Sequence, residues 1–471
     1  MEITQRNYPK ARIGLFAIGL AAYWPQFPGL KEQLEGYYKH IVSELSQFAD
    51  VVQMGLIDNA QDGHTAGMRI AGENVDLLIC HTATYATSSQ VLPIVQQAKV
   101  PVLLLNLQPT SSLDYPNVDT DEWLANCSVC CVPEISNAFH RADIDFQVVS
   151  GMLYNDERVW SKLFDWCQAA TAVRVLRGAR FGFMGHTYPG MLDMYSDFAQ
   201  HHAQIGSHVE VLEMCDLQER VTGATEGDIS AKLDEIHAVF DVAESAAADD
   251  LRWAGQVAVG LDNLVADFEL SALAYYYRGV GGNEYEKLGA ALAVGNSLLT
   301  ARGIPAAGEG DLKNAVAMKI MDVFGTGGSY TEFVAMDFDD SFVLMGHDGP
   351  GHISISDQRP ILRGLELFHG KSGSGVSVEF KVKTGPVTIL CCTQTRQGNI
   401  KFLYSEGESL SGPIMQVGNT NSRIRFSLAP AEFIDAWCAQ APTHHCALGV
   451  GHIAGKLEKF GRLKGLEAVQ V

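Results

Sequence analysis

The N-terminal part of the chain alternates short apolar runs with amphipathic segments, and this alternation constrains the fold more than any other feature. Helical patterns separate the runs, the first of them over 30–48. The apolar runs cover 12–19, 50–57, 76–83 and 101–108. Continuous apolar strands that alternate with helices are typical of a parallel sheet covered on both faces. The pattern therefore predicts a doubly wound α/β domain over residues 1–175.

The same pattern begins again in the middle of the chain. An apolar strand over 180–185 is followed by a Pro-Gly turn and a helix, and a second strand covers 208–214. A helix-rich region follows, and the helix after Glu309 ends this part of the sequence. We expect a second α/β domain over residues 176–328.

The C-terminal part has a different pattern, with short strands separated by turns that contain glycine. In one strand the apolar residues Val378, Phe380 and Val382 alternate with Glu379 and Lys381. This period of two residues predicts an antiparallel β domain, a barrel or a sandwich, over 329–471. Three domains fit the chain length of 471 residues, at roughly 100–200 residues per domain.

The charge balance excludes some partners. Fifty-five acidic and 34 basic residues give a formal net charge of -21, which argues against a nucleic acid or an anionic membrane as partner. The sequence lacks an apolar run of about 18 residues and a basic segment followed by an apolar leader, so we expect no membrane span and a cytoplasmic protein. Apolar surface patches would let such a protein self-associate.

The cysteines and nucleotide motifs are less informative. Of ten cysteines, Cys127 and Cys130 form a C-x-x-C followed by Cys131, but no second such pair follows at zinc-site spacing. We expect buried thiols rather than a metal or redox site. Neither a G-x-G-x-x-G in strand–turn–helix context nor a G-x-x-x-x-G-K-[ST] is present, so a dinucleotide cofactor and ATP chemistry are disfavoured.

A carboxylate occupies an unusual position in the segment "PAAGEGDLKNAVAMKIM". Glu309 lies between Gly308 and Gly310, directly before an amphipathic helix for which Asp311 is a plausible N-cap. Two interpretations stay open here. Glu309 either marks the start of the helix, where the helix dipole favours its ionised form, or belongs to a site. Lys313, one turn into the helix, is expected on the solvated face.

Further carboxylates and imidazoles follow regular elements at positions flanked by glycine. They are Glu332 in "GTGGSYTEF", His347 at the end of an apolar strand with His352 close behind, and His444, His445 and His452 in "APTHHCALGVGHIAG". Each taken alone has an ordinary structural explanation. Two glutamates and two histidines together suit Mn²⁺ or a similar divalent ion, and the absence of a cysteine ligand disfavours structural zinc.

Proton transfer next to a carbonyl is the chemistry that uses such a set. A divalent ion that chelates adjacent oxygens of an open-chain sugar acidifies the carbon between them. One glutamate can then remove a proton from that carbon while the other handles the proton on the neighbouring oxygen. The two carboxyl groups must differ in protonation state, which burial and nearby charge can arrange.

These segments resemble the L-arabinose isomerase family, in the L-fucose/L-arabinose isomerase group. The resemblance rests on "AAGEGDLKNAVAMKIM", the Glu-Phe of "SYTEF", the Gly-His after an apolar strand and the "HH" near the C-terminus, and extends more loosely through "ICHTAT" and "LLLNLQP". It implies a three-domain subunit and a Mn²⁺-dependent interconversion of an aldose and a ketose, with Co²⁺ as another possible ion. It also implies a homo-oligomer, a tetramer or hexamer, with sites between subunits.

The resemblance also assigns residues. It implies that Glu309, Glu332 and His347 bind the metal together with one histidine of the His444–His445 pair, of which His445 is our choice by analogy. Glu309 and Glu332 would then also act as acid and base through an enediol. His444 would contact the substrate.

The sugar is less well defined than the metal set. In place of the family's "GSQHLYG" opening loop stands "GLAAYWPQFPGL", and "CSVCCVPEISNAFHRADI" replaces a second motif. We expect conversion of L-arabinose to L-ribulose. The alternatives are a same-group isomerase acting on D-galactose or L-fucose, and a non-catalytic sugar-binding protein.

Two groups of residues are expected to contact the substrate. Tyr23 and Phe27 could stack on a sugar face, with Gln26 bonded to hydroxyls. His186 and Tyr188, after the strand over 180–185, point toward the expected cleft. Both groups could instead serve packing alone.

Overall fold

The computed structural model describes residues 6–277, 283–364, 367–368, 371–372 and 375–471. The chain divides into two compact units. The smaller unit is Pro9–Arg174, and the larger consists of Met1–Tyr8 and Val175–Val471. Helix α6 (Glu157–Arg177) begins in the first and ends in the second.

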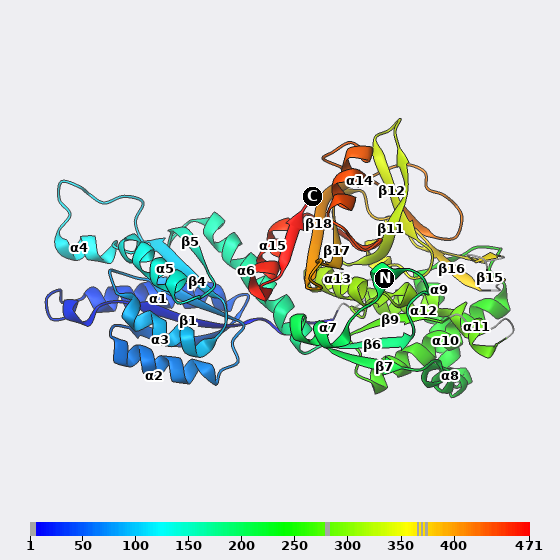
Figure 1. Cartoon of the computed structure of the whole chain (residues 1–471), viewed down its shortest axis with the longest axis horizontal. Helices are drawn as coiled ribbons and strands as arrows, with labels where there is room; N and C mark the ends of the chain where they lie inside the picture. The colour runs from blue at the N-terminus through cyan, green and yellow to red at the C-terminus, as the bar shows by residue number, and fades with distance from the viewer. Residues whose placement is uncertain (1–5, 278–282, 365–366, 369–370, 373–374) are drawn as a thin grey trace. The chain divides into compact units, whose positions relative to one another are not determined.

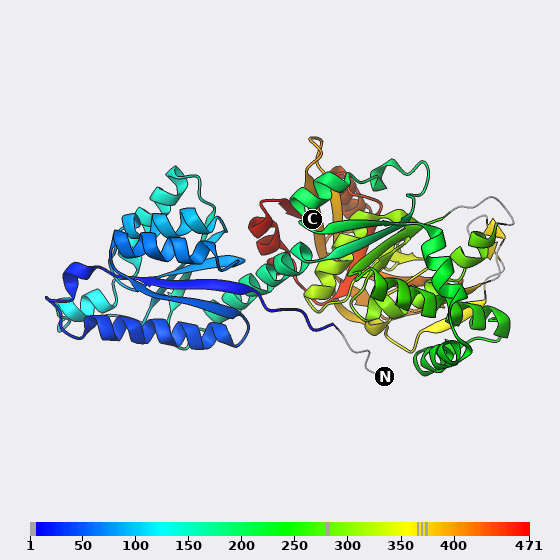
Figure 2. The ribbon, with the colours of Figure 1, turned by 90° about the horizontal axis from the view of Figure 1, so that it is seen from below.

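The smaller unit is a parallel sheet with helices on both faces (Figures 1 and 2). The strand order is β2-β1-β3-β4-β5. Leu78 and Leu104 pack in its fully buried core. The predicted doubly wound α/β domain is confirmed. Its elements are β1 (Arg12–Ile18), η1 (Ala21–Tyr23), α1 (Leu30–Ser46), β2 (Asp50–Ile57), α2 (Ala60–Ala71), β3 (Leu77–Thr82), α3 (Ser88–Ala98), β4 (Val102–Gln108), α4 (Thr120–Ala125), η2 (Val129–Cys131), α5 (Val132–Arg141) and β5 (Phe146–Met152).

The larger unit begins with a second parallel sheet, in the order β10-β9-β6-β7. Apolar side chains such as Met184 and Leu261 pack the sheet against its helices, which confirms the second predicted α/β fold. Its elements are β6 (Arg180–Gly185), η3 (Leu192–Met194), α7 (Phe198–Gln204), β7 (His208–Leu212), α8 (Met214–Thr222), α9 (Glu226–Val239), α10 (Ala248–Asp267), β9 (Ala272–Tyr276), α11 (Glu284–Gly289), α12 (Leu292–Ala301), β10 (Ala306–Ala307), η4 (Gly308–Gly310) and α13 (Leu312–Val323).

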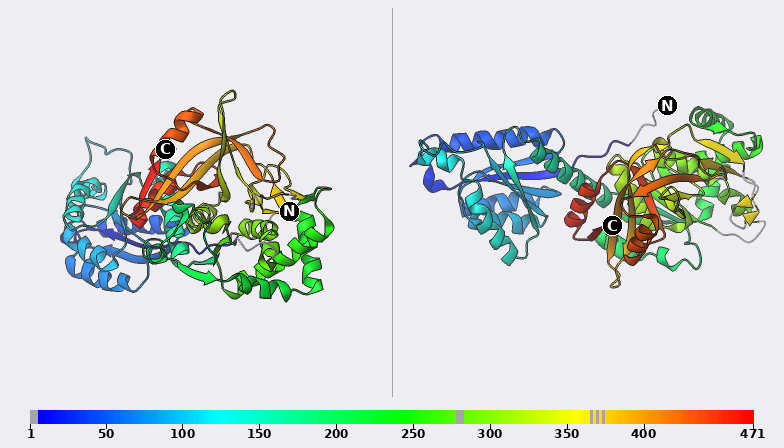
Figure 3. Two further views of the ribbon diagram at one scale, coloured as in Figure 1. Left: turned by 45° about the vertical axis from the view of Figure 1, so that its right-hand side comes forward. Right: turned by 90° about the horizontal axis from the view of Figure 1, so that it is seen from above.

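A seven-stranded sheet follows, in the order β17-β20-β11-β12-β19-β18-β21. An additional β17–β18 pairing closes six of these strands into a barrel, whose yellow to red strands curve around one core in Figure 3. The predicted antiparallel β domain is confirmed as a barrel. Its elements are β11 (Ser329–Asp337), β12 (Phe342–His347), η5 (Ile353–Ile355), β17 (Gly385–Gln394), β18 (Ile400–Leu410), β19 (Thr420–Phe426), α14 (Pro430–Ala439), β20 (His445–Val450), α15 (Ala454–Lys464) and β21 (Glu467–Gln470).

Smaller features complete the larger unit. Short strands β8 (Asp241–Val242), β13 (Ile361–Gly364) and β16 (Val376–Glu379) form one small sheet, and β14 (Leu367–Phe368) pairs with β15 (Lys371–Ser372). The division of the chain into domains 1–175, 176–328 and 329–471 stays a prediction. Within the described residues, no helix is long and apolar enough to cross a membrane.

All ten cysteines are free thiols. Cys127 and Cys131 are buried as expected, but Cys130 is exposed. The expectation of a buried thiol was wrong for Cys130. This residue lies in the short η2 turn, of which Val129 and Cys130 face solvent and Cys131 faces the core.

Candidate metal centre

Glu309 has a backbone conformation that residues other than glycine adopt only at a cost in free energy. It lies in η4, between β10 and α13, with a φ of 57°. A non-glycine residue in this left-handed region costs of order 1–3 kcal/mol. Next to it Gly310 also has a positive φ of 71°, and a Cβ there would come within 2.4 Å of the His186 carbonyl oxygen. The Tyr188 amide donates to the Glu309 carbonyl at 2.9 Å, which holds the turn in place.

Three neighbouring barrel strands bring the other candidates together. Glu332 on β11 is the register partner of His445, the first residue of β20. On the other side of β11 runs β12, which ends at His347. Residues about 100 positions apart in sequence thus become neighbours, because the barrel closes around them.

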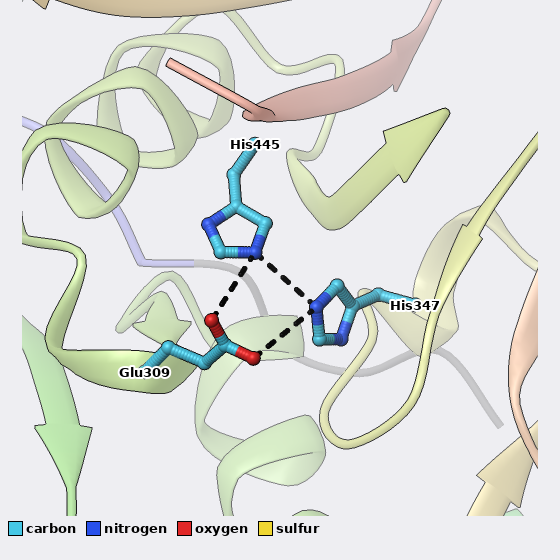
Figure 4. Close-up of side chains that lie close together, drawn as sticks. All are labelled: Glu309, His347 and His445. Atoms are coloured by element: carbon cyan, nitrogen blue, oxygen red, sulfur yellow. Dashed lines mark hydrogen bonds and ion pairs between the residues drawn. The ribbon is translucent and has the colours of Figure 1, made fainter. Parts of the chain in front are cut away.

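Glu309 meets two of these imidazoles directly (Figure 4). Its Oε1 lies 4.0 Å from Nε2 of His347 and its Oε2 lies 3.9 Å from Nε2 of His445, while the two Nε2 atoms are 3.2 Å apart. Oε2 of Glu309 is buried, and within the described part of the chain it has no hydrogen-bond partner. An acceptor left in this way next to imidazole nitrogens fits a bound cation.

A second group of donors overlaps the first. One carboxylate oxygen of Glu332 and one ring nitrogen each of His444 and His445 lie within 4.8 Å of one another. The first group, Glu309, His347 and His445, meets the same criterion. His445 therefore belongs to both groups. Oxygen and imidazole donors in this mixture suit Mn²⁺ or Co²⁺, so the residues present fit the expected ion.

Each of the three imidazoles has a carboxylate at its Nδ1. Asp348 Oδ1 lies 3.1 Å from Nδ1 of His347, and Asp311 Oδ2 lies 3.0 Å from Nδ1 of His445. Asp193 Oδ2 lies 2.6 Å from Nδ1 of His444. An ionised carboxylate only accepts hydrogen bonds, so each Nδ1 carries a hydrogen and each Nε2 is directed toward the glutamates. Carboxylates commonly orient histidines at metal sites in this way.

The electrostatics of the cluster keep Glu309 ionised. Burial alone would raise the pKa of Glu309, but the nearby His444, His445 and His347 outweigh burial and lower it. Burial lowers the pKa of His445. For His347 burial acts in the same direction, yet Asp348 raises its pKa overall. The pKa of His444 rises to about 9, because Glu309 and Asp193 outweigh burial.

A pocket of about 180 Å³ opens beside this cluster. Glu309, His347 and Asp348 form part of its wall. Aromatic and apolar side chains form much of the rest, namely Tyr188, Met191, Tyr275, Tyr276, Tyr277, Leu292, Ala293 and Val376. A small molecule with several hydroxyl groups could bind here, with its polar end against the carboxylate and its carbons against the tyrosine rings.

The remaining predicted residues lie outside the cluster formed by the glutamates and imidazoles. His186 is exposed, packs edge-on against Tyr276 and bonds the Thr187 carbonyl at 2.9 Å. Tyr23 and Phe27 are in edge contact in the smaller unit. In the same turn Gln26 donates to the Ala22 carbonyl. Their contribution to substrate binding stays a prediction.

The other candidate histidines have structural partners. His352 is buried with Nε2 3.5 Å from Asp322 Oδ1, although neither of its ring nitrogens has a hydrogen-bond partner among the described residues. Nε2 of His452 lies 3.1 Å from the Gly407 carbonyl oxygen. These contacts match the ordinary structural explanation.

Two residues at the site have contacts that the sequence analysis did not predict. Tyr330 is fully buried, and its hydroxyl lies 2.8 Å from Nε2 of His445. Its position two residues before Glu332, on the same face of a strand, is the signal that could have identified it. Lys313 was expected in solvent, but it is buried, and its Nζ donates to the Asp193 and Tyr195 carbonyls at 2.5 and 3.0 Å. That expectation was wrong, because α13 is buried along its entire length between the sheet and the barrel.

Known proteins share this sequence pattern. The family model of the L-arabinose isomerase central domain matches residues 196–327. An L-arabinose isomerase of Acidothermus cellulolyticus is 25% identical over 79% of this chain and 75% of its own length. Those of Shouchella clausii and Herpetosiphon aurantiacus are 20% and 23% identical, over 82% and 85% of this chain and 80% and 81% of their own.

These sequence matches indicate that the protein is an aldose–ketose isomerase. Within that class, the chain is similar to L-arabinose isomerases over about four-fifths of its length, and its central part matches the model of their central domain.

Proposed function

We propose that this protein is a metal-dependent isomerase that converts L-arabinose to L-ribulose through an enediol. In this proposal Glu309, Glu332, His347 and His445 hold Mn²⁺, or Co²⁺ in its place. When bound, the ion polarises adjacent oxygens of the open-chain sugar and acidifies the carbon between them. The names of the relatives support the reaction, since they are L-arabinose isomerases.

One observation carries the proposal. Glu309 is held in a left-handed turn, with a buried oxygen that lacks a hydrogen-bond partner among the described residues and faces imidazole nitrogens. Neither the turn nor the orphaned oxygen stabilises the fold. Backbone strain and unpaired polar atoms of this kind are concentrated at functional sites.

The two glutamates divide the proton transfers between them. One removes the proton from the carbon next to the carbonyl, and the other moves a proton between the neighbouring oxygens. The imidazoles that lower the pKa of Glu309 keep it ionised near neutral pH, so Glu309 can accept a proton. The pocket wall beside Glu309 carries several tyrosine rings, and in this proposal these rings shield the enediol from water.

The proposal also covers the location and the oligomeric state of the enzyme. It works in the cytoplasm as a homo-oligomer, a tetramer or hexamer. Its sites lie between subunits, where Tyr23, Gln26 and Phe27 contact the sugar together with His186, Tyr188 and His444. The net charge of -21 supports a small neutral substrate rather than an anionic one.

The experiment that tests the function is an isomerase assay on the purified protein. L-arabinose is supplied after chelation of metal and again after Mn²⁺ or Co²⁺ is restored, and L-ribulose is measured. Glu309→Gln and Glu332→Gln variants are assayed in parallel, with circular dichroism as a check of folding. Metal-dependent product that both substitutions abolish supports the proposal. Wild-type turnover in either folded variant contradicts it.

The same assay separates the alternatives. D-galactose and L-fucose are supplied under identical conditions, because the altered Tyr23–Phe27 loop could change the preferred sugar. Turnover of one of these sugars, without turnover of L-arabinose, would support an aldose–ketose isomerase with a different substrate. Sugar binding that survives chelation, with no product from any sugar, favours a non-catalytic sugar-binding protein.

A further inference from the structure

One of the three carboxylate–imidazole pairs is built differently from the other two. Asp348 is adjacent to His347 in sequence, and Asp311, which pairs with His445 134 residues away, follows the proposed ligand Glu309 by two residues. Asp193 is near no proposed ligand in sequence and reaches His444 from a separate turn, 251 residues away. Asp193 Oδ2 accepts two hydrogen bonds from the same residue, from the backbone N–H of His444 at 2.9 Å and from Nδ1 at 2.6 Å. Both the backbone and the ring of His444 are therefore fixed by one oxygen.

The hydrogen on Nδ1 determines what the other ring nitrogen can do. Because a carboxylate accepts only, Nδ1 of His444 is the donor. Its Nε2 lies 3.9 Å from Oε2 of Glu309, the oxygen that lacks a hydrogen-bond partner among the described residues. His444 is about one-third exposed, in contrast to His445, which is fully buried. The side chain of His444 is therefore more accessible from outside the cluster than that of His445.

Residues 188–195, which include η3, form the turn that carries Asp193, and this turn is itself held by hydrogen bonds. Nζ of the buried Lys313 donates to the backbone carbonyls of Asp193 and Tyr195 and lies 3.5 Å from Oε1 of Gln394 at the end of β17. At its other end, the turn bonds the Glu309 carbonyl through the Tyr188 amide. One buried cation thus ties this turn to the same helix, α13, that follows the Glu309 corner.

We propose that Asp193 is a positioning residue that directs Nε2 of His444 toward the reacting oxygens of the substrate, and that Lys313 anchors the turn on which Asp193 lies. This inference rests on the proposed function, since it assigns His444 the exchange of a proton or hydrogen bond with the sugar. His444 stands beside the proposed metal set, so loss of Asp193 disturbs catalysis without removing the metal.

The test compares Asp193→Asn and Asp193→Glu with Asp197→Asn as a matched control. Asp197 caps α7 through a bond to the Gln200 amide, and asparagine keeps such a cap. We expect Asp193→Asn to lower kcat about 10- to 100-fold, as loss of such an orienting carboxylate does. KM and Mn²⁺ affinity should change little, and Asp193→Glu should recover part of the loss. Equal kcat for Asp193→Asn and the control, or equal loss for Asp193→Glu, overturns the proposal.

A second readout needs no activity. Histidine labelled with ¹³C and ¹⁵N reports which ring nitrogen carries hydrogen, with the His444 signals assigned by a His444→Gln variant. We expect hydrogen to stay on Nδ1 in the wild type when the pH is raised above about 9 and the ring becomes neutral, and we expect this preference to be lost in Asp193→Asn. Hydrogen on Nε2 alone in the wild type overturns the inference. If the wild type converts no sugar, the proposed function fails, and this spectrum still decides whether Asp193 orients His444.

The anchoring by Lys313 is tested separately. Lys313→Met should speed hydrogen exchange of the amides in the turn and lower kcat in the same direction as Asp193→Asn, and Lys313→Arg should retain part of the protection. Unchanged exchange in the turn of a folded Lys313→Met variant overturns the anchoring role.

Discussion

The two oxygens of Asp311 connect a helix to an imidazole. Oδ1 accepts the Asn314 amide at 2.9 Å and so caps α13, while Oδ2 lies 3.0 Å from Nδ1 of His445. Because Glu309 is two residues before this cap, the start of the helix and the orientation of His445 are fixed by the same side chain. The relative placement of Glu309 and His445 depends on it.

The two roles of Asp311 can be separated by substitution. Asparagine keeps a capping oxygen but offers an amide to His445, whereas alanine removes both contacts. We expect Asp311→Asn to fold and to bind Mn²⁺ about 10- to 100-fold more weakly. Asp311→Ala should in addition lose about 1 kcal/mol of helix capping. Mn²⁺ titration and urea unfolding measure the two effects, and wild-type affinity in Asp311→Asn would show that His445 does not need the carboxylate.

The left-handed turn at Glu309 predicts an unusual order of stabilities. Glu309→Ala and Glu309→Gly both remove the carboxylate and differ only in the Cβ. We expect both variants to be inactive, and the glycine variant to be more stable by about 1 kcal/mol, because only glycine adopts this φ freely. Denaturant unfolding without added metal measures the difference. Equal stability would mean that the turn relaxes once the carboxylate is gone.

Metal removal should change stability as well as activity. A ligand that binds only the folded state stabilises it by about 2.7 kcal/mol at 100 times its Kd. Chelation should therefore lower Tm, and restored Mn²⁺ or Co²⁺ should raise it again. In Glu309→Gln the same additions should have little effect. A Tm that responds equally in both proteins would locate the ion at another site.

A buried lysine outside the site predicts a pH dependence. Burial lowers the pKa of Lys319 from 10.5 to about 7, although its Nζ bonds the Tyr8 hydroxyl and the Gly303 carbonyl. Between pH 7 and 10.5 the folded protein binds fewer protons at this group than the unfolded chain does. The free energy of unfolding should therefore increase with pH in this window and have no such contribution below pH 7.

Comparison with Lys319→Met isolates this effect. Tm is measured for both proteins at several pH values from 7 to 9. The wild type should gain stability relative to the variant as the pH rises. Parallel curves would show that Lys319 keeps an ordinary pKa in the folded protein.

Local patterns were sufficient for much of the fold. The apolar runs predicted β1 to β4 within a residue or two, because a strand buried on both faces must be apolar throughout. The cap at Asp311 was also predicted, since capping depends on residues three positions apart. Lys313 was assigned to solvent wrongly. Helical periodicity shows where side chains point, but not that a barrel covers the polar face too.

The sequence by itself determined the two parallel sheets, the antiparallel β domain, and the types of residue that form the candidate site. Tertiary structure alone decided which of them meet. The pairing of β11 with β20 sets Glu332 beside His445, and the turn holding Asp193 reaches His444 from the other side. The reason is physical. Periodicity and capping act over a few residues, whereas barrel closure and loop packing join residues more than 100 positions apart, and no short-range pattern encodes their distance.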